Sequence, residues 1–442
     1  MNIADSEIIV GHLASHGYSK VSDPATADVI LLNTCAIREH AEERIVGRLT
    51  DLARLKATRP ERLLGICGCM AQHHRDALTA RVPALDLIVG PDGYRRLPAL
   101  LAAAEENQGR REAVTDVRLD PDELYEDLAV ARPDDAVRAW ITVMRGCDKF
   151  CTFCVVPYVR GRERSLPAEA ILAEVERVAA SGMCEVVFLG QTVNAYHDGQ
   201  ASFADLLRRT AEVDGITRIR FTSPHPADMT PELIEVMGTV DAICPQLHLP
   251  VQSGSDAVLA AMDRGYTIAA YRDLVARIRT AVPGIALSTD IIVGFPGEEI
   301  PDFDATCQLL EEIGFDQAYL YKYSRRSLTK AARWEDPIPP EEKSRRLTHI
   351  IDLQEAIAAE RNARWIGHEV EVLVEGPARR PPGHVVGKTA HFTTAVVPGP
   401  AEPGTLVTAT ITSATGHTLV ATGPECAPGL SAATSGTRAA AD

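Results

Sequence analysis

The chain has 442 residues, of which 45% are hydrophobic and 24% charged, and this composition indicates a globular protein with room for about three domains. No apolar run is long enough to span a bilayer and no basic segment precedes an apolar one at the amino terminus, so we expect a cytoplasmic protein without membrane contacts. The net charge of −16 counts against a nucleic-acid partner. Ten cysteines without a secretion signal favour metal or cluster chemistry over disulfides.

Residues 1–104 alternate amphipathic helices with short apolar strands, which we place at 29–33, 62–66 and 86–89. Continuous apolar strands between helices predict a parallel α/β sheet covered on both faces. Residues 105–136 are acidic and aperiodic, and we interpret them as a linker over the surface.

Residues 137–362 contain a second series of alternating strands and helices. We expect a partial (β/α)6 barrel, in which ligands bind at the carboxyl ends of the strands. Residues 363–424 contain short segments in which apolar and polar residues alternate, separated by Gly and Pro, and this pattern predicts a small β-barrel. Residues 425–442 should be a disordered tail. The six barrel strands are expected at 139–144, 185–189, 218–221, 246–249, 287–293 and 315–321.

The most informative motif is C-x3-C-x2-C, formed by Cys147, Cys151 and Cys154 directly after the first barrel strand. Three thiolates within eight residues can hold a four-iron cluster and leave one iron open for another ligand. A ferredoxin run would need a fourth nearby cysteine, and structural zinc would need two C-x2-C pairs or a following His-x3-His. We therefore assign a catalytic cluster to these three cysteines.

The triad resembles the signature of the radical S-adenosylmethionine (SAM) enzymes. The resemblance implies that the open iron binds SAM and that the reduced cluster cleaves it to a 5'-deoxyadenosyl radical. It also places Phe153 near the adenine, and Gly190 and Gln191 near the methionine amino group of SAM. Packing beside the cluster explains Phe153 equally well, and a strand-ending turn explains Gly190 and Gln191. His225 and His248 follow two further strands, so we expect both at the opening formed by the carboxyl ends of the barrel strands. Neither is assigned as catalytic.

Further motifs make the chain similar to the MiaB-type tRNA methylthiotransferases over nearly its whole length. They are Asn33-Thr-Cys-Ala-Ile-Arg38, Gly68-Cys-Met-Ala-Gln72, Arg160-Gly-Arg-Glu163, Leu189-Gly-Gln191, Arg218-Ile-Arg-Phe-Thr222 and Leu247-His-Leu-Pro-Val-Gln-Ser-Gly-Ser-Asp256. The resemblance implies a methylthiotransferase amino-terminal domain, a radical SAM domain and a carboxy-terminal TRAM domain. One departure is Arg325-Arg-Ser-Leu-Thr329, which replaces a familiar Arg-Pro-Gly-Thr turn.

By the same resemblance, Cys35 and Cys69 hold a second [4Fe-4S] cluster, whose first ligand is missing here. Cys67 has no counterpart in the family. The family's first strand is also missing, and Met1-Asn2 fits the last two residues of its Gly-Cys-Gln-Met-Asn motif. Either the true start lies upstream or the protein lacks the ligand; we favour a misplaced start, because loss of a central strand would expose an apolar edge.

The resemblance implies methylthiolation of C2 of N6-isopentenyladenosine at position 37, next to the tRNA anticodon. The expected partners are the tRNA anticodon arm, an external electron donor and a sulfur source, and we expect a monomer. Two alternatives stay open: another target, such as a different tRNA adenosine or a ribosomal-protein Asp, and an RNA-binding remnant that cannot transfer sulfur. Basic residues near the mouth and on the TRAM domain are expected to contact phosphates. These residues are Arg138, Arg145, Arg160, Arg162 and Arg164 around the triad, and Arg379, Arg380 and Lys388 on the TRAM domain.

Overall fold

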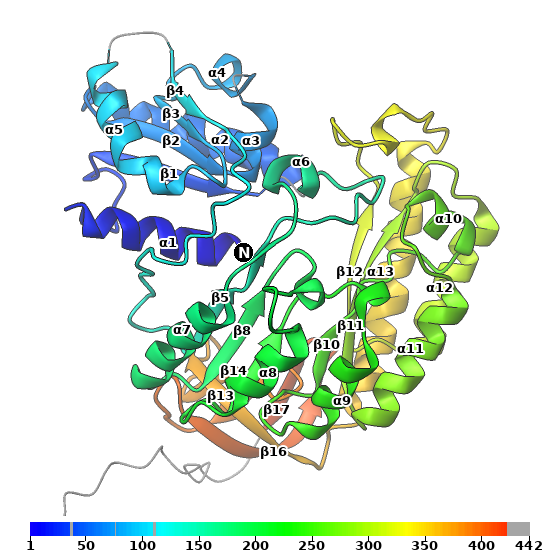
Figure 1. The fold of residues 1–442 in the computed structure, drawn as a ribbon. Helices are drawn as coiled ribbons and strands as arrows, with labels where there is room; N and C mark the ends of the chain where they lie inside the picture. Colours follow the sequence, from blue (N-terminus) through cyan, green and yellow to red (C-terminus); the bar gives the residue numbers. More distant parts are fainter. Residues whose placement is uncertain (36–38, 76, 109–111, 422–442) are drawn as a thin grey trace, which may run out of the picture.

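The computed structural model describes residues 1–35, 39–75, 77–108 and 112–421, with the amino-terminal domain and the TRAM domain at opposite ends of the barrel (Figure 1). The amino-terminal domain is built on a four-stranded parallel sheet in the order β1-β2-β3-β4. The strands are β1 (Val29–Thr34), β2 (Leu63–Gly68), β3 (Leu87–Val89) and β4 (Val114–Asp116). β2 and β3 are buried throughout because helices cover both faces.

Two hydrophobic clusters lie on the two faces of this sheet. Helices α1 (Asn2–Ser15) and α5 (Leu97–Glu106) pack on one face. Helices α2 (Glu39–Ala53), α3 (Cys69–His74) and α4 (Ala77–Arg81) pack on the other. The predicted parallel α/β sheet is confirmed.

The expected linker proves more structured than its sequence indicated. β4 lies inside it and extends the sheet by pairing with β3. Tyr125 is buried, and its hydroxyl donates to the Pro91 carbonyl at 2.8 Å. The prediction of a surface linker was wrong for these residues, because a three-residue strand is too short to show a period.

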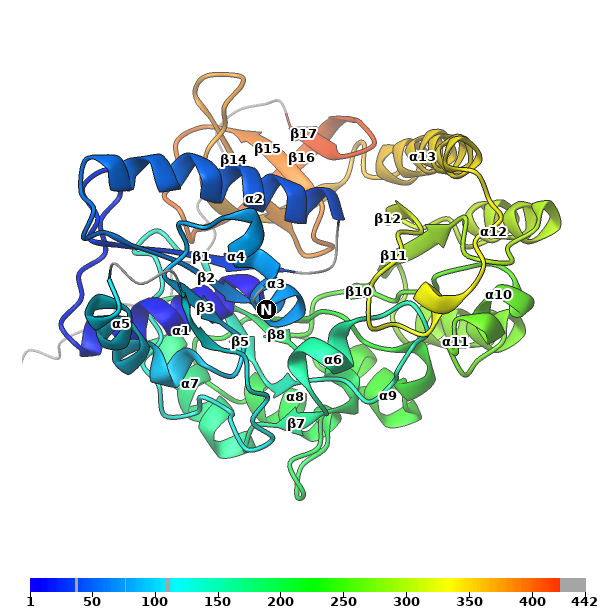
Figure 2. The same ribbon diagram turned by 90° about the horizontal axis from the view of Figure 1, so that it is seen from above.

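The central domain holds six parallel strands in two three-stranded sheets, which together form an open arc with helices outside it (Figure 2). All six predicted strands are confirmed. They are β5 (Arg138–Thr142), β8 (Glu185–Leu189), β9 (Arg218–Phe221), β10 (Gln246–His248), β11 (Ala286–Val293) and β12 (Gln317–Lys322). The flanking helices include α7 (Ala168–Ala180), α8 (Phe203–Ala211), α9 (Pro231–Thr239), α10 (Asp256–Ala261), α11 (Ile268–Ala281) and α12 (Ile300–Ile313).

Short elements follow β5: the pair β6 (Met144–Arg145) and β7 (Arg164–Ser165), with α6 (Val156–Arg160) between them. The 24-residue helix α13 (Pro340–Ala363) packs on β12 and leads to a closed five-stranded barrel. Its strands are β13 (Glu369–Pro377), β14 (His384–Thr389), β15 (Thr394–Pro398), β16 (Leu406–Ala414) and β17 (Thr418–Ala421). The predicted small β-barrel is thus confirmed, whereas the predicted tail lies outside the described residues.

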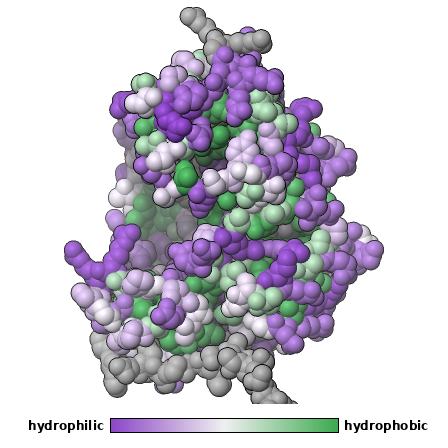
Figure 3. Space-filling view, turned by 90° about the vertical axis from the view of Figure 1, so that its left-hand side faces the viewer, coloured by the Kyte–Doolittle hydropathy of each residue, from purple (hydrophilic) through white to green (hydrophobic). Residues whose placement is uncertain are grey.

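The face on the left of Figure 1 is hollowed between the amino-terminal domain above and the lower part of the molecule (Figure 3). No helix among the described residues is long and apolar enough to cross a membrane. The exact domain boundaries at residues 104, 136 and 362 stay predictions.

Candidate active site

The cysteine triad lies in the loop between β6 and α6, at the carboxyl end of the first barrel strand. Thr152 anchors this loop: its amide donates to the Met262 carbonyl at 3.0 Å, and its carbonyl accepts from the Ala331 amide at 2.9 Å. Both partners belong to segments that follow other strands. The loop is therefore held in place by the far side of the barrel. Cys147 and Cys151 are buried, and Cys154 is half-buried.

Two side chains that the sequence did not single out contact the triad. The Thr192 hydroxyl lies 3.1 Å from Cys147 Sγ, and Arg264 Nη1 donates to Cys151 Sγ at 3.4 Å. Thr192 adjoins the quoted Leu189-Gly-Gln191 motif, which was the only signal in the sequence that pointed to it. Nothing in the pattern around Arg264 indicates a cluster contact.

The donor set fits a cluster better than a single ion. Burial raises the pKa of the Cys147 thiol, and raises that of Cys154 to about 12, so the thiolates need a nearby positive charge such as iron. A tetrahedral zinc with Zn–S bonds of about 2.3 Å would hold its sulfurs roughly 3.8 Å apart. Among the described residues, only Glu42, His73 and His74 bring three metal-ligand atoms within 4.8 Å of one another. The three triad sulfurs do not form such a close set, so they are not gathered for a single zinc ion.

The residues expected to contact SAM have different surroundings. Phe153 packs edge-on against Phe295, with ring centroids 6.5 Å apart, which agrees with a packing role as well as with adenine contact. A Cβ on Gly190 would lie 2.7 Å from Met144 Cγ, so packing alone explains this glycine. Gln191 Oε1 is buried and has no hydrogen-bond partner within the described part of the chain. Of the three, Gln191 most clearly offers a polar group to a ligand.

The two histidines predicted to face one mouth have separate neighbours. His225 packs against Tyr266, and burial lowers its pKa to about 2, so it is neutral. His248 lies with its Nδ1 3.1 Å from the Ser288 hydroxyl and its Nε2 3.4 Å from Asp290 Oδ2. His248 lines a cavity of about 270 Å³ between the barrel and the TRAM domain, and His225 does not.

The second set of thiols comes from adjacent strands of the amino-terminal sheet. β1 and β2 run parallel with Thr34 beside Gly68, so Cys35 and Cys69 follow at the same edge. Cys69 begins α3 and is buried, and Cys35 is half-buried. Cys67 points instead into the core formed with α1 and α5, where burial raises its pKa to about 12. Alternation along β2 thus accounts for Cys67 as a core residue.

The arginines near the triad are not a free positive surface, which corrects the expectation that they all contact phosphates. Each forms an ion pair within the chain, and only Arg162 has a mostly exposed side chain. The pairs are Arg138 with Glu185, Arg145 and Arg160 with Asp5, Arg162 with Asp148, and Arg164 with Asp92.

The Arg218-Ile-Arg-Phe-Thr222 motif joins the barrel to the TRAM domain. Arg218 Nη1 donates to the Lys388 carbonyl at 3.1 Å, and Arg220 donates to the carbonyls of Thr389 and Ala390 at 2.9 and 2.8 Å. Lys388 is half-buried, and its ammonium donates to the Thr394 hydroxyl, which corrects its expected role as a phosphate contact. Arg379 and Arg380 are exposed.

The fold is shared with solved radical SAM enzymes. A radical SAM methyltransferase, TsrM from Kitasatospora setae, matches with a TM-score of 0.57 and 16% identity, over 75% of this chain and 72% of that one. OxsB, a cobalamin-dependent SAM radical enzyme, matches with a TM-score of 0.51 and 13% identity over 80% and 53%. The family model of the radical SAM superfamily matches residues 141–310, that of uncharacterized protein family UPF0004 residues 1–90, and that of the TRAM domain residues 363–422. The barrel with its cysteine triad is thus a radical SAM enzyme, and this class implies a [4Fe-4S] cluster and SAM.

Curated relatives narrow the class. The enzyme named tRNA-2-methylthio-N(6)-dimethylallyladenosine synthase is 44% identical in Chlorobium limicola over 424 residues, which is 95% of both chains. The enzyme of the same name from Carboxydothermus hydrogenoformans is 42% identical over 88% of this chain and 89% of its own. The chain belongs to this family of radical SAM tRNA methylthiotransferases.

Proposed function

We propose that the protein methylthiolates C2 of N6-isopentenyladenosine at position 37 of tRNA, giving 2-methylthio-N6-isopentenyladenosine. The observation that carries this proposal is the placement of two thiol sets: Cys69 is linked through Arg160 to the loop that bears the triad. A radical generator alone needs one set. The names of the relatives support the isopentenyl-type adenosine as the target.

In this proposal Cys147, Cys151 and Cys154 hold the cluster that binds SAM. Cys35 and Cys69 are two ligands of a second [4Fe-4S] cluster, whose first family ligand has no counterpart in this chain. When bound, the first cluster and SAM supply a radical able to attack an unactivated C–H bond, which side chains cannot do. Thr192 and Arg264 fix two triad sulfurs, and Gln191 and Phe153 orient SAM. Gly190 lets the end of β8 pack against Met144.

The RNA is held, in this proposal, by the TRAM domain, with the exposed Arg379 and Arg380 on its phosphates. An external electron donor and a sulfur source complete the reaction.

Nucleoside analysis of tRNA tests the target. Cells that lack the protein should lose 2-methylthio-N6-isopentenyladenosine and accumulate the precursor without sulfur, and the full chain should restore the product. Unchanged levels in the deletion would contradict the proposal. Loss of a different methylthio nucleoside, or of a methylthio-Asp in a ribosomal protein, would identify an alternative target.

A further inference from the structure

Three side chains of the amino-terminal domain form a close set of metal-ligand atoms. Glu42 lies on α2, and His73 and His74 end α3. Their ligand atoms all lie within 4.8 Å of one another, and His74 Nε2 is 3.2 Å from Glu42 Oε2. The side chains of Glu42 and His73 are only 7% and 2% exposed. Two helices on one face of the sheet thus bring a carboxylate and two imidazoles together.

The contacts of His73 leave one of its ring nitrogens available. Its Nε2 lies 2.8 Å from the Ser327 hydroxyl and 3.3 Å from the Ser327 carbonyl oxygen. Because a carbonyl can only accept, the second contact places the ring proton on Nε2 and leaves a lone pair on Nδ1. Metal-binding histidines are held in this way, with the other ring nitrogen donating to a carbonyl, a carboxylate or water.

A gap separates this lone pair from the carboxylate. His73 Nδ1 is 3.9 Å from Glu42 Oε1, and both atoms are buried without a hydrogen-bond partner in the described part of the chain. Burial acts to raise the pKa of Glu42, but contacts with His73, His74 and Arg326 lower it to about 2, so the acid is ionised. Two buried electron-pair donors at this separation need a cation between them. A hydrogen bond would bring them to about 2.7–3.2 Å, whereas zinc bonds of about 2.0–2.2 Å separate two ligands by roughly 3.4 Å or more.

Arg326 and Ser327 connect this place to the barrel. They belong to the turn 325–329 after β12, whose sequence departs from the family pattern. Arg326 Nη1 lies 3.1 Å from Glu42 Oε2 and so orients the carboxylate from outside, as hydrogen-bond partners of metal ligands do. Its Nη2 is buried without a partner among the described residues, and it would donate to an anionic fourth ligand such as hydroxide. Such a ligand would offset the charge that a divalent ion adds beside the guanidinium.

We propose that Glu42, His73 and His74 bind a zinc ion. The ligand atoms are a Glu42 carboxylate oxygen, His73 Nδ1 and His74 Nε2. Two imidazoles and one carboxylate are a donor set that zinc uses in enzymes, with a fourth position open. None of the three ligands is a cysteine, so the proposal does not depend on how many iron clusters the chain holds.

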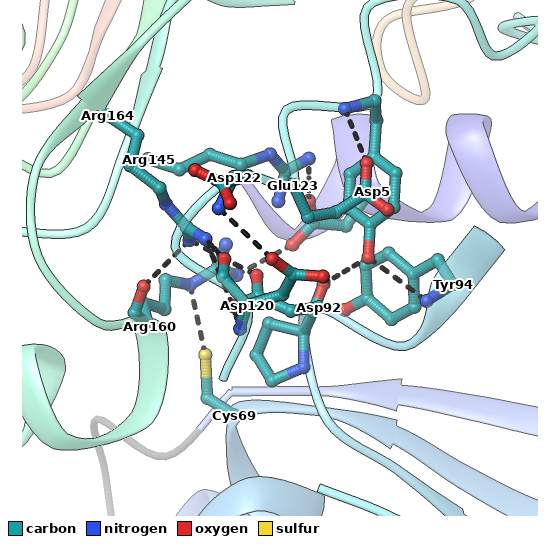
Figure 4. Close-up of polar contacts among 12 residues, drawn as sticks. Asp5, Cys69, Asp92, Tyr94, Asp120, Asp122, Glu123, Arg145, Arg160 and Arg164 are labelled. Atoms are coloured by element: carbon teal, nitrogen blue, oxygen red, sulfur yellow. Dashed lines mark hydrogen bonds and ion pairs between the residues drawn. The ribbon is translucent and has the colours of Figure 1, made fainter. Parts of the chain in front are cut away.

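The zinc ion would complete the attachment of α3. The first end of this helix is held by the triad loop, because Arg160 Nε donates to Cys69 Sγ at 3.1 Å (Figure 4). The zinc ion would join the last residues of α3 to α2 and, through Arg326 and Ser327, to the loop after β12. Segments that follow the first and the last strand of the barrel would then hold α3 at both ends.

Zinc binding to the iron-reconstituted full chain tests the proposal, because iron then occupies the cysteines. We expect about one zinc per chain after gel filtration, and zinc-edge X-ray absorption should show nitrogen and oxygen at about 2.0–2.1 Å without sulfur at about 2.3 Å. Glu42→Gln and His74→Ala should each weaken zinc binding at least about 10-fold, since each removes a ligand. The control His197→Gln changes an exposed histidine and should bind zinc like the unmodified chain.

Hydrogen exchange separates zinc binding from folding. Zinc should slow exchange several-fold in peptides that contain α2, α3 and residues 323–339 of the unmodified chain, and it should not do so in His74→Ala. The His74 side chain is 29% exposed, so this variant is expected to keep the metal-free exchange pattern elsewhere in the chain. No retained zinc, a sulfur-containing zinc shell, or zinc binding that both ligand variants leave unchanged would overturn the proposal.

Discussion

The buried carboxylate of Glu185 lies 3.2 Å from Arg220 Nε, at the edge of the barrel where the TRAM domain docks. Arg220→Ala would remove one cation from this group and two hydrogen bonds to the TRAM turn. We expect the free energy of unfolding to fall by about 1–3 kcal/mol, because two buried hydrogen bonds are lost while Glu185 keeps its ion pairs with Arg138 and Arg218. Urea denaturation measures this. Arg208→Ala, which breaks an exposed pair with Glu232, should cost less than about 1 kcal/mol; equal effects would contradict the docking role.

Replacement of the triad cysteines by alanine should remove one of two clusters. We expect the reconstituted iron content to fall from about eight to about four atoms per chain, with complete loss of the methylthio nucleoside. Iron and sulfide analysis and nucleoside mass spectrometry give the readouts. Cys184→Ala removes a half-buried thiol elsewhere and should leave both unchanged. An iron content of about four in the unmodified chain would instead favour the RNA-binding remnant.

Gly190 tolerates no side chain if the observed packing is correct. Gly190→Ala should lower the free energy of unfolding by about 1–3 kcal/mol, since its Cβ would be 2.7 Å from Met144 Cγ. Gly47 lies in α2 with open space around it, so Gly47→Ala should instead raise stability by about 1 kcal/mol through helix propensity. Chemical denaturation compares the two. A neutral Gly190→Ala would leave SAM contact as the better account of this glycine.

Leu328 occupies a position where glycine is favoured, within the unusual Arg325–Thr329 turn. Its φ is +76° and its side chain is 49% exposed. Leu328→Gly should raise the free energy of unfolding by about 0.5–1 kcal/mol, because it relieves a left-handed backbone at little cost in burial. Leu119, also exposed, is not among the described residues with positive φ, so Leu119→Gly should destabilise by a similar amount. Thermal unfolding distinguishes the two signs.

His225 should make stability depend on pH. Its pKa in the folded protein is about 2, against 6.5 as the ordinary value, mainly because burial disfavours the charged form. Between these values the unfolded chain binds the extra proton, so acidification below about pH 6.5 favours unfolding, by up to ~1.4 kcal/mol per pH unit. The free energy of unfolding, measured by denaturation at pH 7 and at pH 5, should differ less between the two pH values in His225→Gln than in the unmodified chain. The exposed His197→Gln serves as control; an identical slope in all three would contradict the buried, neutral state.

Much of the architecture is predictable because the strands are apolar and regularly spaced. All three amino-terminal strands and all six barrel strands were expected from local pattern, and the triad from its spacing. β4 was missed because three residues are too few to show a periodic pattern, and because the strand is defined by its pairing with β3, which the local sequence does not reveal. Within the site, the partners of the arginines could not be foreseen: Asp5 lies 155 positions from Arg160 in the chain. Local composition suggested a basic surface, whereas in the folded protein most of those arginines form buried ion pairs with acidic residues.

The TRAM domain docks at Arg138 and Arg218, which begin β5 and β9, and at Arg220 two positions further along β9, whereas the triad lies beyond the end of β5. A five-residue strand such as β8 separates these two edges by roughly 17 Å. If the TRAM domain binds the RNA, as proposed, the modified base must lie at the triad edge, at a fixed distance from the RNA bound at the TRAM edge. A free nucleoside cannot span that length. Substrate length, and not only base identity, would decide what this enzyme modifies.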